Sequence, residues 1–248
     1  MGITRRRFLG RAAGAVTMGL GGLPLDLWRL GWSLVAVEAS RRCVLLDLKQ
    51  HCCLGESVAG YESALTSAGA PVLRADAQRV SPSRCAVLIV PATLEIPPPA
   101  VRAIVRCLQA GATVILESGA GFAARRDVRA HRVALRDHLQ VRVEAPVQLW
   151  SAHPSAQRIP YVDYTWPHPA KVRDFSRVVP LGSQAGEVIA WVDGLPVALK
   201  RQSGRGRLIF LGSPLGPALW AGDAEARRWL LDCVAVSSHQ SAALPFPC

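Results

Sequence analysis

The feature that most constrains this chain is a regular alternation of short apolar runs with amphipathic segments between residues 43 and 116. Four apolar runs, each about five residues long, have the length and composition of buried strands. These runs are 43–48, 71–74, 86–90 and 112–116. Between them, residues 57–68 and 97–111 carry apolar side chains at helical spacing, and Gly69 and Gly111 mark where these helices end. This alternation predicts an α/β fold, in which a mostly parallel sheet is covered by helices on both faces.

The pattern changes after residue 140 and predicts a C-terminal antiparallel β extension of the sheet. Val141, Val143 and Val147 alternate with polar residues, as in an exposed edge strand. Residues 150–170 form a loop rich in Pro, His and aromatic side chains. Three further strands are predicted at 188–192, 195–200 and 207–211, and the first two are joined by the turn Asp193-Gly194. A helix over 223–236 closes the domain, and residues 237–248 are expected to form a flexible tail.

The first 39 residues match an export signal and are excluded from the predicted fold. Arg5, Arg6, Phe8 and Leu9 form a twin-arginine motif, which the Tat translocase would bind. A weakly apolar segment rich in Gly and Ala follows, and small residues permit cleavage after Ala39. Alternatively, residues 12–37 remain as an uncleaved anchor that associates with a membrane. Both alternatives place residues 40–236 in the periplasm or another extracytoplasmic compartment.

Charge and cysteine content exclude some partners and cofactors. The net charge of +11 comes mostly from Arg, but no basic cluster is flanked by aromatic residues, so no nucleic-acid partner is expected. The seven Cys residues have no metal-ligand spacing, so neither a metal nor a cofactor is expected. Apolar neighbours indicate buried thiols at Cys85, Cys107 and Cys233, whereas Cys52, Cys53 and Cys248 are better redox candidates. No particular disulfide is predicted.

Two stretches resemble the class I glutamine-amidotransferase-like superfamily. They are Ala-Gly-Ala-Thr-Val-Ile-Leu-Glu-Ser-Gly at 110–119 and the closing strands within 196–214. The resemblance covers about residues 41–236 and is nearest to non-catalytic members, such as the trimerisation domains of β-galactosidases and ThuA-like proteins. It implies a flavodoxin-like three-layer sandwich over residues 40–236.

The residues that make such domains catalytic are not in register here. Catalytic members carry a Gly-x-Cys-x-Gly turn after the fourth strand, where the helix N-terminus activates the thiol. The segment 117–121 places Glu117 at the first Gly and Gly119 where the Cys belongs. Near the end of the sheet, His168-Pro169-Ala170 lacks the acid of a His-Pro-Glu signature. Amidotransferase activity is therefore not expected.

Other chemistry at the same turn stays open. The candidate catalytic residues are Ser118, Glu117, Cys52, His51 and His168. Ser118 is one residue early for a hydrolase elbow and suits the cap of the following helix. Glu117 lies at the carboxyl end of a parallel strand, where ligands gather, and acts either as a base or ligand contact or as an acceptor for nearby loop amides. The candidate ligand-binding residues are Glu117, Ser118, Gly119, His51, Tyr164 and Trp166.

The sequence thus predicts an exported, non-catalytic domain that binds a small polar ligand or a protein partner at the carboxyl edge of its sheet. One alternative is a hydrolase or amidase that uses Ser118 or Cys52 with a His, which would need that pair in an open cleft. Another alternative is a structural subunit of a membrane-associated complex.

Overall fold

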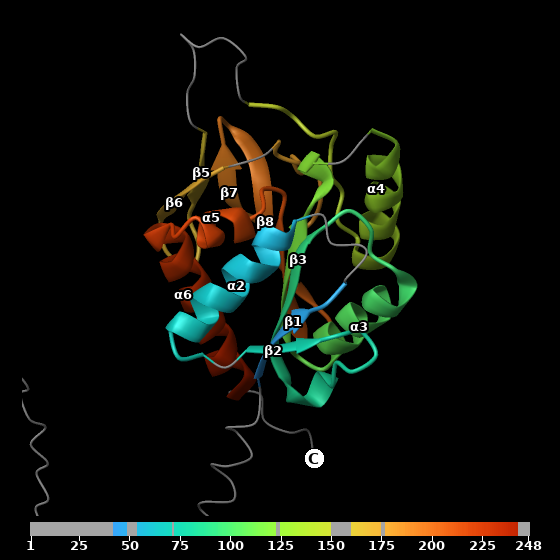
Figure 1. Cartoon of the computed structure of the whole chain (residues 1–248). Coiled ribbons are helices and arrows are strands. Elements are labelled where there is room, and N and C mark those ends of the chain that lie inside the picture. Colours follow the sequence, from blue (N-terminus) through green and yellow to red (C-terminus); the bar gives the residue numbers. More distant parts are fainter. Residues whose placement is uncertain are drawn as a thin grey trace, which may run out of the picture. The chain divides into compact units, whose positions relative to one another are not determined.

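A computed structural model describes residues 42–48, 54–70, 72–122, 125–149, 160–174 and 177–242, which belong to one compact unit, Ser40–Cys248. The strands are β1 (Arg42–Leu46), β2 (Val72–Ala75), β3 (Cys85–Thr93), β4 (Thr113–Ser118), β5 (Tyr161–Tyr164), β6 (Ala170–Arg173), β7 (Glu187–Val192), β8 (Leu195–Ser203) and β9 (Gly206–Leu211). The helices are α2 (Gly55–Ser67), α3 (Pro98–Gln109), α4 (Arg125–Leu139), α5 (Gly216–Trp220) and α6 (Ala224–Ala242), with short 3₁₀ helices η2 (Pro82–Arg84) and η3 (Ala120–Phe122). Figure 1 shows their arrangement.

All nine strands form one mixed sheet in the order β2-β1-β3-β4-β9-β8-β7-β5-β6. The predicted α/β class is confirmed. The prediction of a mostly parallel sheet is not confirmed, because the four pairs from β2 to β9 are parallel and the four from β9 to β6 are antiparallel. The difference arises because the antiparallel strands continue the same sheet and make up nearly half of it.

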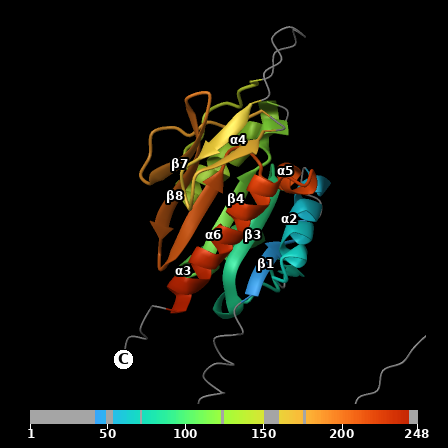
Figure 2. The ribbon, with the colours of Figure 1, turned by 90° about the vertical axis from the view of Figure 1, so that its left-hand side faces the viewer.

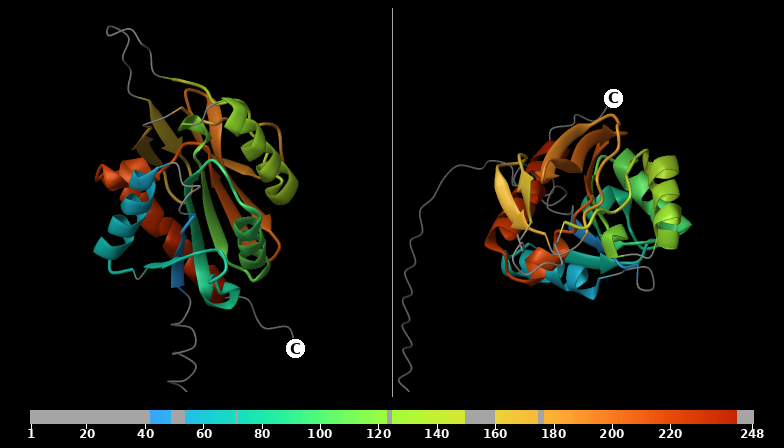
Figure 3. Two further views of the ribbon diagram at one scale, coloured as in Figure 1. Left: turned by 45° about the vertical axis from the view of Figure 1, so that its right-hand side comes forward. Right: turned by 90° about the horizontal axis from the view of Figure 1, so that it is seen from above.

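Helices cover both faces of the sheet, as Figure 3 shows from the side and from above. The core on one face joins the sheet to α3 and α4, and the core on the other face joins it to α2, α5 and α6. Figure 2 shows α6 lying across its face of the sheet. Side chains along β4 point alternately to the two faces of the sheet, so this strand contributes to both cores. Val114 and Leu116 belong to the first core, and Ile115 belongs to the second.

Three local predictions need correction. Residues 141–147 form no named strand and contribute only two isolated bridges, Val143 with Leu181 and Val147 with Val178. The predicted aromatic loop contains the β5–β6 hairpin, whose alternating buried residues include Val162 and Tyr164. The last helix begins at Ala224 and continues to Ala242, well past the predicted end at residue 236.

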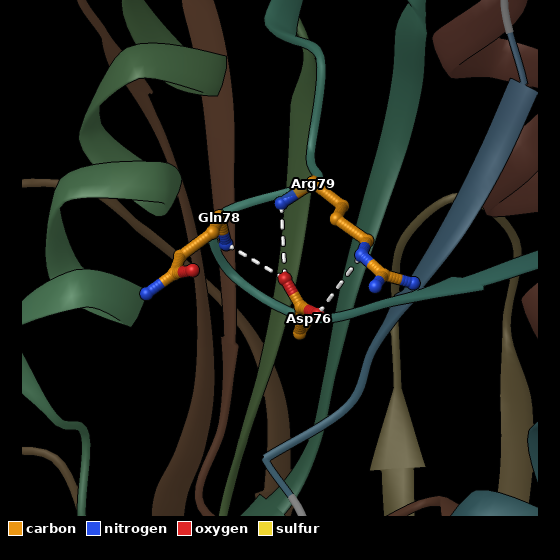
Figure 4. Close-up of polar contacts among 3 residues, drawn as sticks. All are labelled: Asp76, Gln78 and Arg79. Carbon is orange, nitrogen blue, oxygen red and sulfur yellow. Dashed lines mark hydrogen bonds and ion pairs between the residues drawn. The ribbon is translucent and has the colours of Figure 1, made fainter.

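The turn after β2 shows how the chain leaves a short edge strand. Oδ1 of Asp76 accepts hydrogen bonds from the backbone N–H groups of Gln78 (3.1 Å) and Arg79 (3.0 Å). The other carboxylate oxygen lies 3.4 Å from Nε of Arg79 (Figure 4). An Asp that bonds the backbone two and three residues ahead stabilises a turn, and this turn leads into η2 and β3.

None of the described helices is long and apolar enough to cross a membrane. The predicted export motif at Arg5, Arg6, Phe8 and Leu9 and the predicted anchor at 12–37 lie outside the described residues.

Candidate functional site

The carboxyl end of β4 carries two polar side chains that are completely buried, Glu117 and Ser118. Because successive residues of a strand point to opposite faces, the two side chains enter different helical layers. Glu117 contacts residues of α2 and the start of α5, whereas Ser118 contacts His131 of α4. The predicted turn therefore places its two candidate residues in two separate sites.

Five donors surround the carboxylate of Glu117. Oε1 accepts hydrogen bonds from the Tyr61 hydroxyl (2.6 Å) and from the backbone N–H groups of Leu215 (2.7 Å) and Gly216 (2.8 Å). Oε2 accepts from the Ser57 hydroxyl (2.6 Å) and from the backbone N–H of Ala92 (3.0 Å). These partners come from α2, β3 and the β9–α5 connection, so one side chain ties β4 to three other parts of the chain.

Burial raises the pKa of the Glu117 carboxyl, and the hydrogen bonds from Ser57, Tyr61 and the two backbone amides act in the opposite direction. The net effect is a pKa above the ordinary value for Glu. Burial, followed by the nearby Glu117 charge, also raises the pKa of Tyr61, so its hydroxyl keeps the proton that it donates. A buried carboxylate is tolerated when its oxygens are filled with donors in this way.

The sequence left two roles open for Glu117, a base or ligand contact and an acceptor for nearby amides. The geometry supports the second role, because three of the five donors are backbone amides and the side chain is inaccessible to solvent. Gly119, also predicted to bind a ligand, uses its backbone N–H for a bond to the carbonyl of Thr93 (2.8 Å). The expected polar ligand site therefore finds no support at Glu117 or at this amide.

On the other face, Ser118 and His131 form a buried pair. Nε2 of His131 lies 2.9 Å from Oγ of Ser118, and Nδ1 lies 3.0 Å from the carbonyl oxygen of Leu94. A carbonyl only accepts hydrogen bonds, so Nδ1 carries the proton and Nε2 accepts the proton of the Ser118 hydroxyl. Oγ of Ser118 also accepts a bond from the N–H of Ala120 (3.2 Å), which is the capping role that the sequence allowed.

This tautomer is the one that a general base beside a serine nucleophile requires. The hydroxyl of a hydrolase elbow, however, is exposed to its substrate. Ser118 is fully buried, and only 1% of His131 is exposed. The pair therefore has the hydrogen bonding of a nucleophile and base without the open cleft that the hydrolase alternative requires.

The buried His131 predicts an acid-sensitive term in stability. Burial lowers its pKa from 6.5 to about 4. Between these values the unfolded chain binds a proton that the folded protein does not, so this stabilisation is complete above pH 6.5 and is lost as the pH falls towards 4. The size of the shift corresponds to about 3 kcal/mol in the free energy of unfolding.

Urea unfolding of the wild type and of His131→Gln, measured from pH 7 to pH 4, checks this prediction. The wild type should lose more stability on acidification than His131→Gln does. His138→Gln, which changes an exposed residue of the same helix, is the matched control and should follow the wild type. Parallel curves for the wild type and His131→Gln would show that His131 is not held neutral.

Tyr164 and Trp166, two of the candidate ligand-binding residues, pack against α6. The buried ring of Tyr164 lies 4.5 Å from that of Trp229. The carbonyl of Trp166 accepts a hydrogen bond from Nε1 of Trp229 (2.7 Å), and Nζ of Lys200 lies 4.6 Å from the Trp166 ring. These contacts explain the aromatic residues by packing and a cation–π interaction.

His168 also lies against α6 and away from the β4 turn. Its Nδ1 is 2.9 Å from Oδ2 of Asp232. Asp232 in turn lines a shallow hollow of about 270 Å³ on the first turns of α6, together with Gly222, Ala224, Arg227, Arg228 and Leu231. The structure thus does not bring His168 together with Ser118 or Glu117. His51 and Cys52, the other two catalytic candidates, lie outside the described residues.

The partners of Glu117 and Ser118 were not predicted from the sequence as site residues: Ser57, Tyr61, Ala92, His131, Leu215 and Gly216. His131 has the spacing of the inward positions of α4, since it lies three residues after Val128 and four before Leu135. Tyr61 is buried on the inner face of α2, but no local signal in the sequence shows that its hydroxyl bonds to Glu117. Among the described residues, no group of three or more His, Cys, Asp or Glu side chains is arranged to hold a metal ion.

No protein-family model and no curated protein matches the sequence. Solved structures do share the fold. A β-galactosidase from Bacillus circulans sp. alkalophilus is 15% identical with a TM-score of 0.55, and the match covers 76% of this chain and 31% of that one. The exo-β-1,4-mannosidase Op5Man5 from Opitutaceae bacterium strain TAV5 is 12% identical with a TM-score of 0.53, covering 89% and 39%. The cytoplasmic protein STM1381 from Salmonella typhimurium LT2 is 10% identical with a TM-score of 0.58, covering 79% and 98%.

The chain therefore spans only about a third of the length of the two glycosidases and nearly the whole length of the Salmonella protein. At these identities the likeness shows a common fold and does not extend to an activity.

Proposed function

We propose that residues 40–242 form a non-catalytic, flavodoxin-like domain of the glutamine-amidotransferase-like type, which binds a protein partner at the carboxyl edge of its sheet. The observation that carries this proposal is the environment of Glu117. At the turn where catalytic relatives need a reactive side chain, this carboxylate is buried and accepts five hydrogen bonds from the domain itself. Its role is to hold the edge together.

The order of the parallel strands supports the fold in this proposal. The sequence β2-β1-β3-β4-β9 runs across the sheet in the order of flavodoxin-like domains, with β9 as the fifth parallel strand. The match of about a third of two glycosidases agrees with a domain that also occurs as a part of larger proteins.

Exposed aromatic residues favour a protein partner over a small polar ligand. Phe122, in η3 directly after the β4 turn, is 43% exposed, and Trp220, at the end of the helix that follows β9, is 62% exposed. Both segments leave strands at the carboxyl edge. Large aromatic side chains left in water are typical anchors of protein interfaces.

Photo-crosslinking tests this surface. We expect p-benzoylphenylalanine at position 122 or 220 to crosslink to one defined partner in extracts of the native host. The same probe at position 73, on the edge strand β2, should not, although Leu73 is exposed to a similar degree as Phe122. Equal crosslinking at all three positions, or none at 122 and 220, would contradict the proposed surface.

A hydrolase remains the second candidate because of the Ser118–His131 pair. A fluorophosphonate probe separates the two functions, since it reacts with an activated and accessible serine. A non-catalytic domain predicts no labelling of the folded protein. Stoichiometric labelling that disappears in Ser118→Ala would instead show that the pair opens to solvent and that the domain is an enzyme.

We retain export as part of the proposal, on the basis of the twin-arginine motif and the apolar segment after it. No observation in the described residues favours the third alternative, a structural subunit held to a membrane by residues 12–37.

A further inference from the structure

Two cysteines lie in contact within the core between the sheet and α3. Cys85 is the first residue of β3, and Cys107 lies in the last turn of α3. Their exposed fractions are 1% and 0%, and both belong to the same core cluster. The Cys85 side chain is close enough to Cys107 to act on its thiol.

Topology explains why residues so far apart in sequence meet. β3 runs from the amino edge of the sheet to its carboxyl edge, and α3 returns along the sheet before β4 begins parallel to β3. The end of the helix therefore comes back beside the start of the strand. Consistent with this return path, α3 contacts η2, the short helix that ends immediately before Cys85.

The other two described cysteines, Cys43 and Cys233, are in a different situation. Both lie in the core on the opposite face of the sheet. Burial raises the pKa of Cys43 to about 12 and raises that of Cys233 well above its ordinary value. The hydrogen bond from Cys85, by contrast, lowers the pKa of Cys107. Cys85 and Cys107 thus form a pair of neighbouring thiols in the core on the α3 side of the sheet, and the pKa of Cys107 is lowered within that pair.

We propose that Cys85 and Cys107 form a dithiol site that closes to an intramolecular disulfide by exchange with a low-molecular-weight disulfide such as oxidised glutathione. The Cys107 thiolate attacks one sulfur of the reagent and releases the first glutathione thiolate, leaving a mixed disulfide on Cys107. The Cys85 thiolate then attacks the Cys107 sulfur and releases the second glutathione. The protein loses two protons and two electrons, and one molecule of oxidised glutathione becomes two thiols.

Burial determines when this exchange takes place. A reagent cannot reach thiols that are 1% and 0% exposed in the folded domain. Closure therefore occurs during folding, or when the α3 end opens locally. Reduced, folded protein should react slowly, whereas protein that refolds in the presence of glutathione should close readily.

Peptide mapping tests the proposal, because trypsin places the two cysteines in separate peptides. Residues 85–102 and 107–125 each contain one Cys and end at Arg. After refolding in a reduced and oxidised glutathione mixture and quenching with iodoacetamide, we expect most molecules to yield these two peptides linked by a disulfide. The closed form should melt roughly 5–10 °C higher than the same protein in dithiothreitol.

Single replacements provide the control. Cys85→Ala and Cys107→Ala should each lose the difference in melting temperature between the two redox states, whereas Cys233→Ala should keep it. Recovery of both wild-type peptides in alkylated form from refolded protein with native circular dichroism would overturn the proposal, as would a link from either cysteine to another Cys. The peptide map of the wild-type protein tests the proposal even if a replacement variant fails to fold.

Discussion

Replacing Glu117 by Gln should lower the free energy of unfolding by about 3 kcal/mol, since breaking a buried, hydrogen-bonded charge is among the costliest single changes. The amide is the same size as the carboxylate, but one of its two ends is an NH₂ group. That end would face the Ala92 N–H on one side or the Leu215 and Gly216 N–H groups on the other. The Ser57 and Tyr61 hydroxyls can rotate and accept a hydrogen bond from this NH₂ group, whereas the backbone N–H groups can only donate.

Urea unfolding at pH 7, followed by circular dichroism, measures this loss. Glu62→Gln is the control, because Glu62 belongs to the same helix as Ser57 and Tyr61 but is partly exposed and forms an ion pair of 3.5 Å with Arg74. That change should stay within about 0.5 kcal/mol of the wild type. If Glu117→Gln were equally mild, the five hydrogen bonds would not hold the edge together, and the structural role given to Glu117 would be wrong.

Gly60→Ala should destabilise the domain by about 3 kcal/mol or more, the upper range for overpacking a core. A Cβ atom at Gly60 would lie 2.3 Å from the carbonyl oxygen of Gly216 and 2.8 Å from the backbone N of Trp220. Both obstacles are backbone atoms, so neither can rotate away. α2 and α5 approach so closely here that only a residue without a side chain fits between them.

Gly55→Ala, in the first turn of the same helix, is the matched control. A Cβ atom at Gly55 meets nothing within 4 Å, and Ala favours a helix over Gly, so stability should be unchanged or rise slightly. Chemical denaturation of the two variants side by side measures the difference. Similar stabilities for the two variants would mean that α2 and α5 are not packed backbone to backbone.

The two predictions concern one structural unit. Glu117 draws together the start of α2 and the start of α5, and Gly60 and Gly216 let the two helices touch. A Cβ atom at Gly216 would lie 2.2 Å from Oγ of Ser57, one of the donors to Glu117. We therefore expect Glu117→Gln and Gly60→Ala to be non-additive, since they act on the same contact.

Local sequence signals predicted the first four parallel strands and the helices that follow β1 and β3, whereas the parallel strand β9 was expected in the antiparallel extension. Strands such as 112–116 are continuous apolar runs, and a helix such as 97–111 begins at Pro and ends near Gly, so pattern and turn chemistry agree. The β5–β6 hairpin was missed because each of its strands has only four residues and lies among Pro and aromatic residues that are typical of a loop. An alternation of apolar and polar residues over only four positions is too short to predict a strand.

The sequence by itself determined that an α/β domain with short buried strands forms, and that the turn after residue 116 lacks a nucleophile in the amidotransferase register. These conclusions depend on the order of neighbouring residues along the chain. Only the tertiary structure decided what Glu117 does, because its partners Ser57, Tyr61, Ala92 and Gly216 lie between 25 and 99 residues away in sequence. In the sequence, a carboxylate at the end of a strand looks the same whether water or five hydrogen-bond donors surround it. Only the packing of α2 and α5 over β4 shows that Glu117 is a structural residue and not a binding residue.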